Sequence, residues 1–237
     1  MTAEPGQTGV DDVTEWQLSD YDESRWELEH NPEYGRPFFA LIAGIPNGGV
    51  YEQEVHDLGI LHLPTGQVMA CDPYTDWLGG AGPAIPPGDY RAKVTLADVN
   101  RDDEPVGAYL SIVVRDDLPV GLVRELHQWD ASRKPSPWRI PVDSGVLCFA
   151  DLGAAEEIEH ADLRTALGDG PESWTALQCS PENLTPGYTI ALLPGAVQGA
   201  NIVIGQGTGD GGYSCVTTHA ADGTLLGVHI DLVKFDR

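Results

Sequence analysis

The sequence predicts a mostly β fold, an antiparallel β-sandwich-like domain with one or two short helices. Short apolar runs alternate with turn clusters along most of the chain, which is typical of strands joined by tight loops. Gly and Pro, with 28 and 18 of the 237 residues, supply those turns. Hydrophobic residues make up 41%, enough to form a core, which argues against wholesale disorder.

The chain begins with an acidic leader, residues 1–33, in which ten acidic side chains accompany one basic side chain, Arg25. The segment Thr14–Glu29 favours a helix, so we expect the leader to be partly helical. Residues 34–237 are expected to form a single β-rich domain. A short helix is predicted at Glu156–Leu167, because acids occupy its first turn and Gly168 follows it.

The strongest strand signals are β-branched or alternating segments bounded by glycine, proline or polar turns. They predict strands at Tyr90–Leu96, Val106–Arg115, Trp138–Ala150 (two runs around a turn), Tyr188–Leu193, Asn201–Ile204, Tyr213–His219 and Leu225–Phe235.

The last two strands are predicted to form a hairpin through Asp222-Gly223, a two-residue loop of type I′ character. If Ala221 lies opposite Thr224, His229 lies opposite Val216 and His219 lies opposite Leu226. Alternation then places the two histidines on opposite faces, so they cannot share one metal ion.

The same alternation separates an apolar hairpin face from a polar one. The apolar face should join the core and carries Cys215, Val228, Ile230 and Leu232. The polar face gathers Ser214, His229 and Asp231. This polar group is either the wall of a cleft, with His229 as an acid/base, or a solvated sheet surface.

The net charge of −24 disfavours nucleic acid and anionic membranes as partners. The chain shows no signal-peptide pattern and no apolar run long enough to span a bilayer, so we expect a cytoplasmic protein. Its four cysteines are widely spaced and are expected to be reduced. Cys148 and Cys215 lie in apolar strand-like segments and should be buried.

Two segments resemble ligand-binding loops. Gly205–Gly212 is dense in glycine, but the segment after it reads as a strand and no Lys is near, so a tight turn is favoured over a phosphate cradle. Asp98–Asp103 resembles the start of a calcium loop but lacks its Gly and its final Glu, which favours a solvated turn. No metal site and no cofactor is predicted.

Several motifs together suggest a family. They are Gly66–Pro73 (GQVMACDP), Pro87–Tyr90 (PGDY), Val142–Asp151 (VDSGVLCFAD), Gly205–Tyr213 (GQGTGDGGY) and a Gly-x-x-x-Asp-x-x-x-Phe pattern ending at Phe235. The combination resembles the bacterial domain-of-unknown-function family 4241 over roughly residues 60–235. The resemblance implies a mostly β domain without an established activity, and it marks as motif carboxylates Asp72, Asp143, Asp151 and Asp210.

The candidate catalytic residues are Asp143, assisted by His229 or Asp72. Asp143 is flanked by apolar residues, and a buried carboxylate has a raised pKa that suits proton transfer near neutral pH. A structural role as hydrogen-bond acceptor is the alternative. Aromatic residues in loop-like segments often wall pockets. The substrate-binding candidates are Trp77, Trp138, Trp174, Tyr213 and Asp210.

These features predict a metal-independent acid/base enzyme of the lyase or cyclase type. It would catalyse dehydration, conjugate addition or cyclisation of a largely apolar, natural-product-like small molecule. The alternative is a non-catalytic acidic binding module, an immunity or adaptor protein for a basic partner. A homodimer is compatible with either function.

Overall fold

The computed structural model describes residues 14–17, 53–97, 106–125, 127–129, 135–137, 139–155, 180–181, 184–185, 188–189, 191–194 and 201–232. Its strands are β1 (Thr14–Gln17), β2 (Gln53–Leu63), β3 (Val68–Asp72), β4 (Asp76–Ala81), β5 (Gly88–Ala97), β6 (Val106–Val113), β7 (Leu122–Glu125), β8 (His127–Trp129), β9 (Pro135–Pro137), β10 (Arg139–Val142), β11 (Val146–Asp151), β12 (Leu184–Thr185), β13 (Tyr188–Thr189), β14 (Ala191–Pro194), β15 (Asn201–Gln206), β16 (Gly211–His219) and β17 (Leu225–Asp231).

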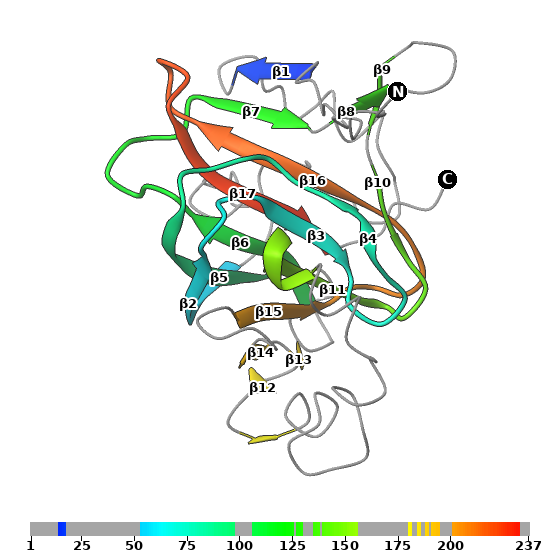
Figure 1. Cartoon of the computed structure of the whole chain (residues 1–237). Coiled ribbons are helices and arrows are strands. Elements are labelled where there is room, and N and C mark those ends of the chain that lie inside the picture. The colour runs from blue at the N-terminus through cyan, green and yellow to red at the C-terminus, as the bar shows by residue number, and fades with distance from the viewer. Residues whose placement is uncertain are drawn as a thin grey trace.

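Two antiparallel sheets form the body of the described structure, which confirms the mostly β prediction (Figure 1). The larger sheet has eight strands in the order β1-β7-β16-β17-β6-β5-β2, with β10 pairing the first part of β16. The smaller sheet has five strands in the order β14-β15-β11-β3-β4. Two further strand pairs, β12–β13 and β8–β9, lie outside these sheets.

The main core lies between the two sheets and follows from the alternation of side chains along each strand. In β5, Ala92, Val94 and Leu96 are buried in this core, whereas Arg91 is exposed on the other face. The smaller sheet contributes Val68, Ala70, Leu147, Phe149 and Val203. Burial of each large apolar side chain contributes about 1.5–3 kcal/mol, so this interior is the main source of stability.

The smaller sheet carries a second apolar cluster on its opposite face, around Met69, Cys71, Cys148 and Ile202. Cys71 and Cys148 are direct partners on β3 and β11, and their Sγ atoms lie 3.5 Å apart as free thiols. The expectation that Cys148 and Cys215 are buried is confirmed.

The β16–β17 hairpin differs from the predicted one in its turn. Gly223 N donates to Ala220 O and Ala220 N donates to Thr224 O, so the loop has three residues. Within this loop, Gly223 has a φ of 87°, a left-handed conformation that favours glycine and is typical of a type I turn followed by a bulge. His219 therefore pairs with Leu225, and the prediction of Leu226 as its partner is wrong.

The predicted helices and one predicted strand end also differ from the structure or lie outside its described residues. The helix expected from Thr14 is wrong at its beginning, because Thr14–Gln17 form β1 and pair with β7. The strand predicted to reach Arg115 ends two residues earlier, at Val113. The predicted helix at 156–167 lies outside the described residues, which include one helical turn at 152–155. Within the described chain, no helix has the length and apolarity needed to cross a membrane.

Candidate functional site

Asp72, a predicted catalytic residue, is a structural acceptor at the end of β3. Its carboxylate is 1% exposed. Oδ2 accepts hydrogen bonds from the backbone N–H groups of Asp143 (2.9 Å) and Ser144 (2.8 Å), and Oδ1 accepts from Ser144 Oγ (2.7 Å) and Tyr74 N (2.9 Å). Four donors compensate the burial of this charge and fix the β10–β11 turn against β3.

Asp143 lies in that turn, and its side chain is exposed. The prediction of a carboxylate buried among apolar residues is therefore wrong. The strand alternation buries Ile140 and Val142, but β10 ends at Val142 and the turn directs the next residue to solvent. The exposed carboxylate lacks the low-dielectric surroundings on which its predicted role depends.

Asp151 repeats the role of Asp72 on the neighbouring strand. It is fully buried and accepts from Thr65 N (2.9 Å), Thr65 Oγ1 (2.8 Å) and Gly153 N (3.0 Å). Of the four motif carboxylates, these two tie loops to strand ends, whereas Asp143 and Asp210 are exposed in loops.

Of the predicted substrate-binding residues, the structure describes the side chains of Tyr213 and Asp210, which lie at the same β15–β16 connection. Tyr213 packs in the inter-sheet core, and its hydroxyl donates to Gly209 O within the β15–β16 loop. That loop runs directly into strand β16, as the turn interpretation of Gly205–Gly212 requires. Trp138 and Trp174 lie outside the described residues, and for Trp77 the structure describes only a backbone place in β4.

His229 occupies a different part of the molecule from the predicted carboxylates. Its neighbours Val228 and Ile230 pack into the inter-sheet core, so His229 lies on the opposite face of the eight-stranded sheet, here called the outer face. It pairs with Val216 as predicted. The proposed combination of His229 with Asp72 and Asp143 is therefore not formed.

The imidazole of His229 is buried and held at both nitrogens by hydroxyl groups. Nδ1 lies 2.8 Å from Ser111 Oγ, and Nε2 lies 2.9 Å from Thr218 Oγ1. Burial lowers the pKa of His229 from 6.5 to about 3, because the charged form would lose its hydration. The ring is consequently neutral near pH 7, with one nitrogen donating and the other accepting.

Gly227 makes this arrangement sterically feasible. It lies opposite Thr218 on β17, two residues before His229. A Cβ atom at Gly227 would lie 2.8 Å from Nε2 of His229 and 3.0 Å from Ile112 O. The absent side chain leaves the space through which the imidazole reaches diagonally to Thr218.

The outer face around His229 is polar but not solvated. Ser214 and His229 are each 3% exposed and Asp231 is 1% exposed, so the alternative of a solvated surface is wrong for these residues. Arg139 Nη1 donates to Ser214 Oγ at 2.6 Å, which shows how one of these buried polar atoms is satisfied.

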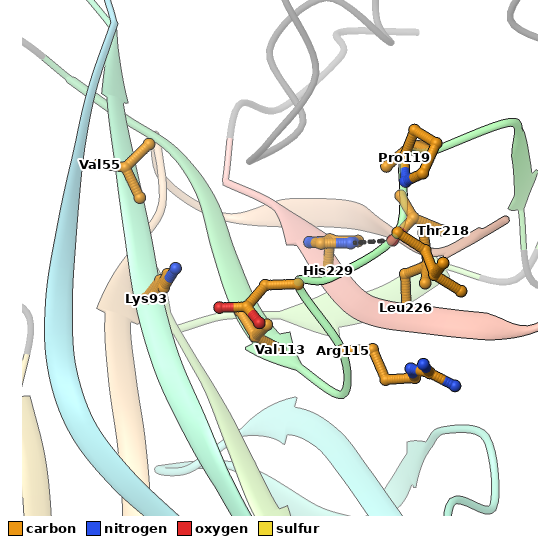
Figure 2. A pocket seen from close by; sticks show the side chains of 11 residues that line it. Val55, Lys93, Val113, Arg115, Pro119, Thr218, Leu226 and His229 are labelled. Carbon is orange, nitrogen blue, oxygen red and sulfur yellow. Dashed lines mark hydrogen bonds between the residues drawn. The ribbon is translucent and has the colours of Figure 1, made fainter.

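His229 and Thr218 line a pocket of about 320 Å³ on the outer face (Figure 2). In Figure 2, His229 lies between Lys93 and Val55 on one side and Thr218 and Leu226 on the other. Apolar side chains form most of the wall, and the complete lining is Val55, Lys93, Val113, Arg115, Asp116, Leu118, Pro119, Val120, Thr218, Leu226 and His229.

Residues 114–120 form one wall of this pocket and are anchored at both ends. Val114 N and Arg115 N both donate to Leu226 O, at 2.8 and 3.0 Å, and Gly121 N donates to His219 O at 2.8 Å. A Cβ atom at Gly121 would lie 2.7 Å from the backbone nitrogen of Ala221, so this glycine permits the close approach. The wall is therefore fixed to the β16–β17 hairpin.

Sequence reasoning identified His229 but missed Ser111, Thr218 and Lys93. Their positions follow from register, since Lys93, Ser111 and His229 are successive partners across β5, β6 and β17. The described residues contain no group of three metal-ligating side chains. The calcium-like segment Asp98–Asp103 lies outside them.

The comparisons with known proteins place the chain in a family. No curated protein and no solved structure is significantly similar to the chain. The model of the family described as "Protein of unknown function (DUF4241)" matches residues 61–230, which include β17 up to Ile230 and the Asp72, Asp143 and Asp151 motifs. Because this match covers well over half of the sequence, the chain belongs to the DUF4241 family.

Proposed function

We propose that the protein binds a small, largely apolar molecule in the His229 pocket. The supporting observation is that a buried, neutral imidazole and the hydroxyl of Thr218 line a pocket whose other walls are mainly apolar. Small-molecule sites commonly combine such walls with a few fixed polar groups. The volume of about 320 Å³ lies near the lower end of the usual range.

The hairpin offers a matched pair of variants that tests this proposal. Thr218 contacts His229 in the pocket, whereas Thr217 makes an equivalent 2.9 Å contact with Nε2 of His219 outside it. Thr218→Val and Thr217→Val therefore remove the same kind of hydrogen bond on opposite faces of one strand.

The measurement is binding of a panel of small apolar fragments, followed by NMR shifts of the Leu226 methyl groups and the His229 ring. Wild type and Thr217→Val should bind the same fragments, and Thr218→Val should bind them at least about tenfold more weakly. The proposal fails if no fragment shifts these resonances, or if both variants lose binding equally.

A second proposal is the acid/base enzyme of lyase or cyclase type. The contact between Thr218 and His229 favours it, because a hydroxyl beside an imidazole can relay a proton. With a pKa of about 3, however, accepting a proton is about 5 kcal/mol harder than for a base of pKa 7. Catalysis would therefore require a bound ligand that raises this pKa.

The enzyme proposal is tested by incubating wild-type protein with a metabolite extract and comparing it with Thr218→Val and Thr217→Val. Conversion of one compound to its dehydrated or isomeric product, lost only in Thr218→Val, would support it. The absence of any such conversion would remove it. The acidic adaptor for a basic partner and the homodimer stay predictions from the sequence.

We further propose a cytoplasmic location. The support is the pair Cys71 and Cys148, directly opposed on neighbouring strands and present as free thiols. Reducing compartments preserve such thiol pairs.

A further inference from the structure

We propose that the ligand of the His229 pocket carries one negative charge, as a carboxylate does, on an apolar body, and that the Lys93 ammonium binds this charge. The inference rests on the proposed function, since it names the chemical class of the molecule bound at the same site.

The pocket lining carries charged side chains of both signs. The lining holds two positive side chains, Lys93 and Arg115, and one negative side chain, Asp116, and the charge of Arg115 is already balanced by Asp117. The whole chain, by contrast, has a net charge of −24. Within this lining, Lys93 is therefore the cation that can attract an anion, in a protein whose excess of acids otherwise repels one.

Lys93 has no counter-ion among the described residues, whereas two neighbouring cations have one. Arg115 donates to both carboxylate oxygens of Asp117, at 2.9 and 2.7 Å. Arg91, two residues along β5, lies 3.6 Å from Asp57. Lys93 forms no ion pair in the described chain, although its side chain is half-buried. A half-buried cation in an apolar-walled pocket is stabilised by a bound anion.

A bound carboxylate would also set the direction of the hydrogen bonds around Thr218. A carboxylate only accepts, so the hydroxyl of Thr218 must donate to it. Thr218 Oγ1 is then left to accept from Nε2–H of His229, and Nδ1 accepts from the hydroxyl of Ser111. Every donor in this series of hydrogen bonds then has an acceptor. The neutral His229 ring fits the series without a change of protonation.

The remaining wall specifies the rest of the ligand. Val55, Val113 and Leu226 offer no hydrogen bonds to a second charged group, and the guanidinium of Arg115 is already bound to Asp117. A single ammonium acts as a point charge and matches one carboxylate. The structure therefore favours a monoanion with an aliphatic or aromatic body over a sugar or a dianion.

Octanoate and octanamide provide a matched pair of probes that differ in charge and share an apolar body. Calorimetry would measure their affinities for wild type, Lys93→Met and Arg91→Met. Methionine keeps the apolar stem of residue 93 and removes its charge. Arg91→Met removes a charge from the same strand outside the pocket lining. Melting curves of both variants check that each is folded.

We expect octanoate to bind wild type and Arg91→Met at least about tenfold more tightly than Lys93→Met, with octanamide indifferent to the variant. Nitrogen chemical shifts should show His229 in the Nε2–H tautomer when octanoate is bound. Equal binding of the two probes, or unchanged octanoate binding in Lys93→Met, would overturn the charge inference alone. If neither probe binds wild type, the charge inference fails, and the proposed function fails too if the uncharged fragments do not bind.

Discussion

Thr218 Oγ1 and His229 Nε2 lie 2.9 Å apart across β16 and β17, although the two residues are not direct partners in the ladder. Thr218 pairs with Gly227, and His229 pairs with Val216. The hydrogen bond is therefore diagonal, and it passes over the position where Gly227 has no side chain.

Gly227→Ala should break this contact. The new Cβ would lie 2.8 Å from Nε2 of His229 and 3.0 Å from a backbone oxygen that cannot easily move. Overpacking of this kind costs about 1–3 kcal/mol. Chemical denaturation should show that loss, and the His229 ring resonances should shift.

Gly88→Ala is the matched control for Gly227→Ala, because its nearest contact would be an ordinary 3.7 Å to the Tyr90 ring. Equal stability losses in the two variants would contradict the steric explanation.

The pH dependence of stability should reveal the buried imidazole. The pKa of His229 falls from 6.5 to about 3 on folding, so the unfolded chain takes up the proton first as the pH falls. The stabilising contribution is complete above about pH 6.5 and is lost between there and pH 3, at roughly 1.4 kcal/mol per pH unit.

Urea denaturation of wild type and His229→Gln between pH 7 and pH 4 measures this effect, because glutamine does not titrate. The difference in unfolding free energy between the two proteins should shrink as the pH falls. A constant difference would show that His229 titrates normally in the folded protein.

Asp72→Asn should destabilise the protein, whereas Asp143→Asn should leave its stability almost unchanged. Asparagine at position 72 would turn an NH₂ group toward donors that now meet a carboxylate, at a cost of about 1–3 kcal/mol. Asp143 is exposed, and its substitution should change stability by less than about 0.5 kcal/mol. Melting temperatures of the two variants decide the point, and a large loss in Asp143→Asn would count against the assignment.

Cys215 should resist alkylation in the native protein. It is fully buried, and burial raises the pKa of its thiol far above the ordinary value, so almost no thiolate exists at pH 8. Iodoacetamide followed by peptide mass mapping should modify Cys215 only after denaturation. Rapid native labelling would show that β16 opens frequently.

The fold was predictable because alternation along single strands carries the information locally. Ala92, Val94 and Leu96 occupy every second position of β5, so this strand alone predicts which of its faces is buried. The β16–β17 register was also correct at His229, although the turn was wrong. The three-residue loop shifts the strand pairing by one residue relative to the predicted two-residue loop. The irregularity between Thr218 and His219 shifts the pairing back.

The site was less predictable because it depends on contacts between distant segments. The exposure of Asp143 depends on where β10 stops, and the burial of Asp72 depends on donors 71 and 72 residues away. Likewise, Ser111 reaches His229 across 118 residues of sequence. Such partners become visible only when the strand order is known.

The empty space at Gly227 also links two positions in the evolution of the family. A relative with any larger residue there could not keep a histidine in this pose two positions later, so the two sites are expected to vary together. Sorting aligned sequences by the residue at this position would separate the family members that share this pocket from those whose pocket has a different shape.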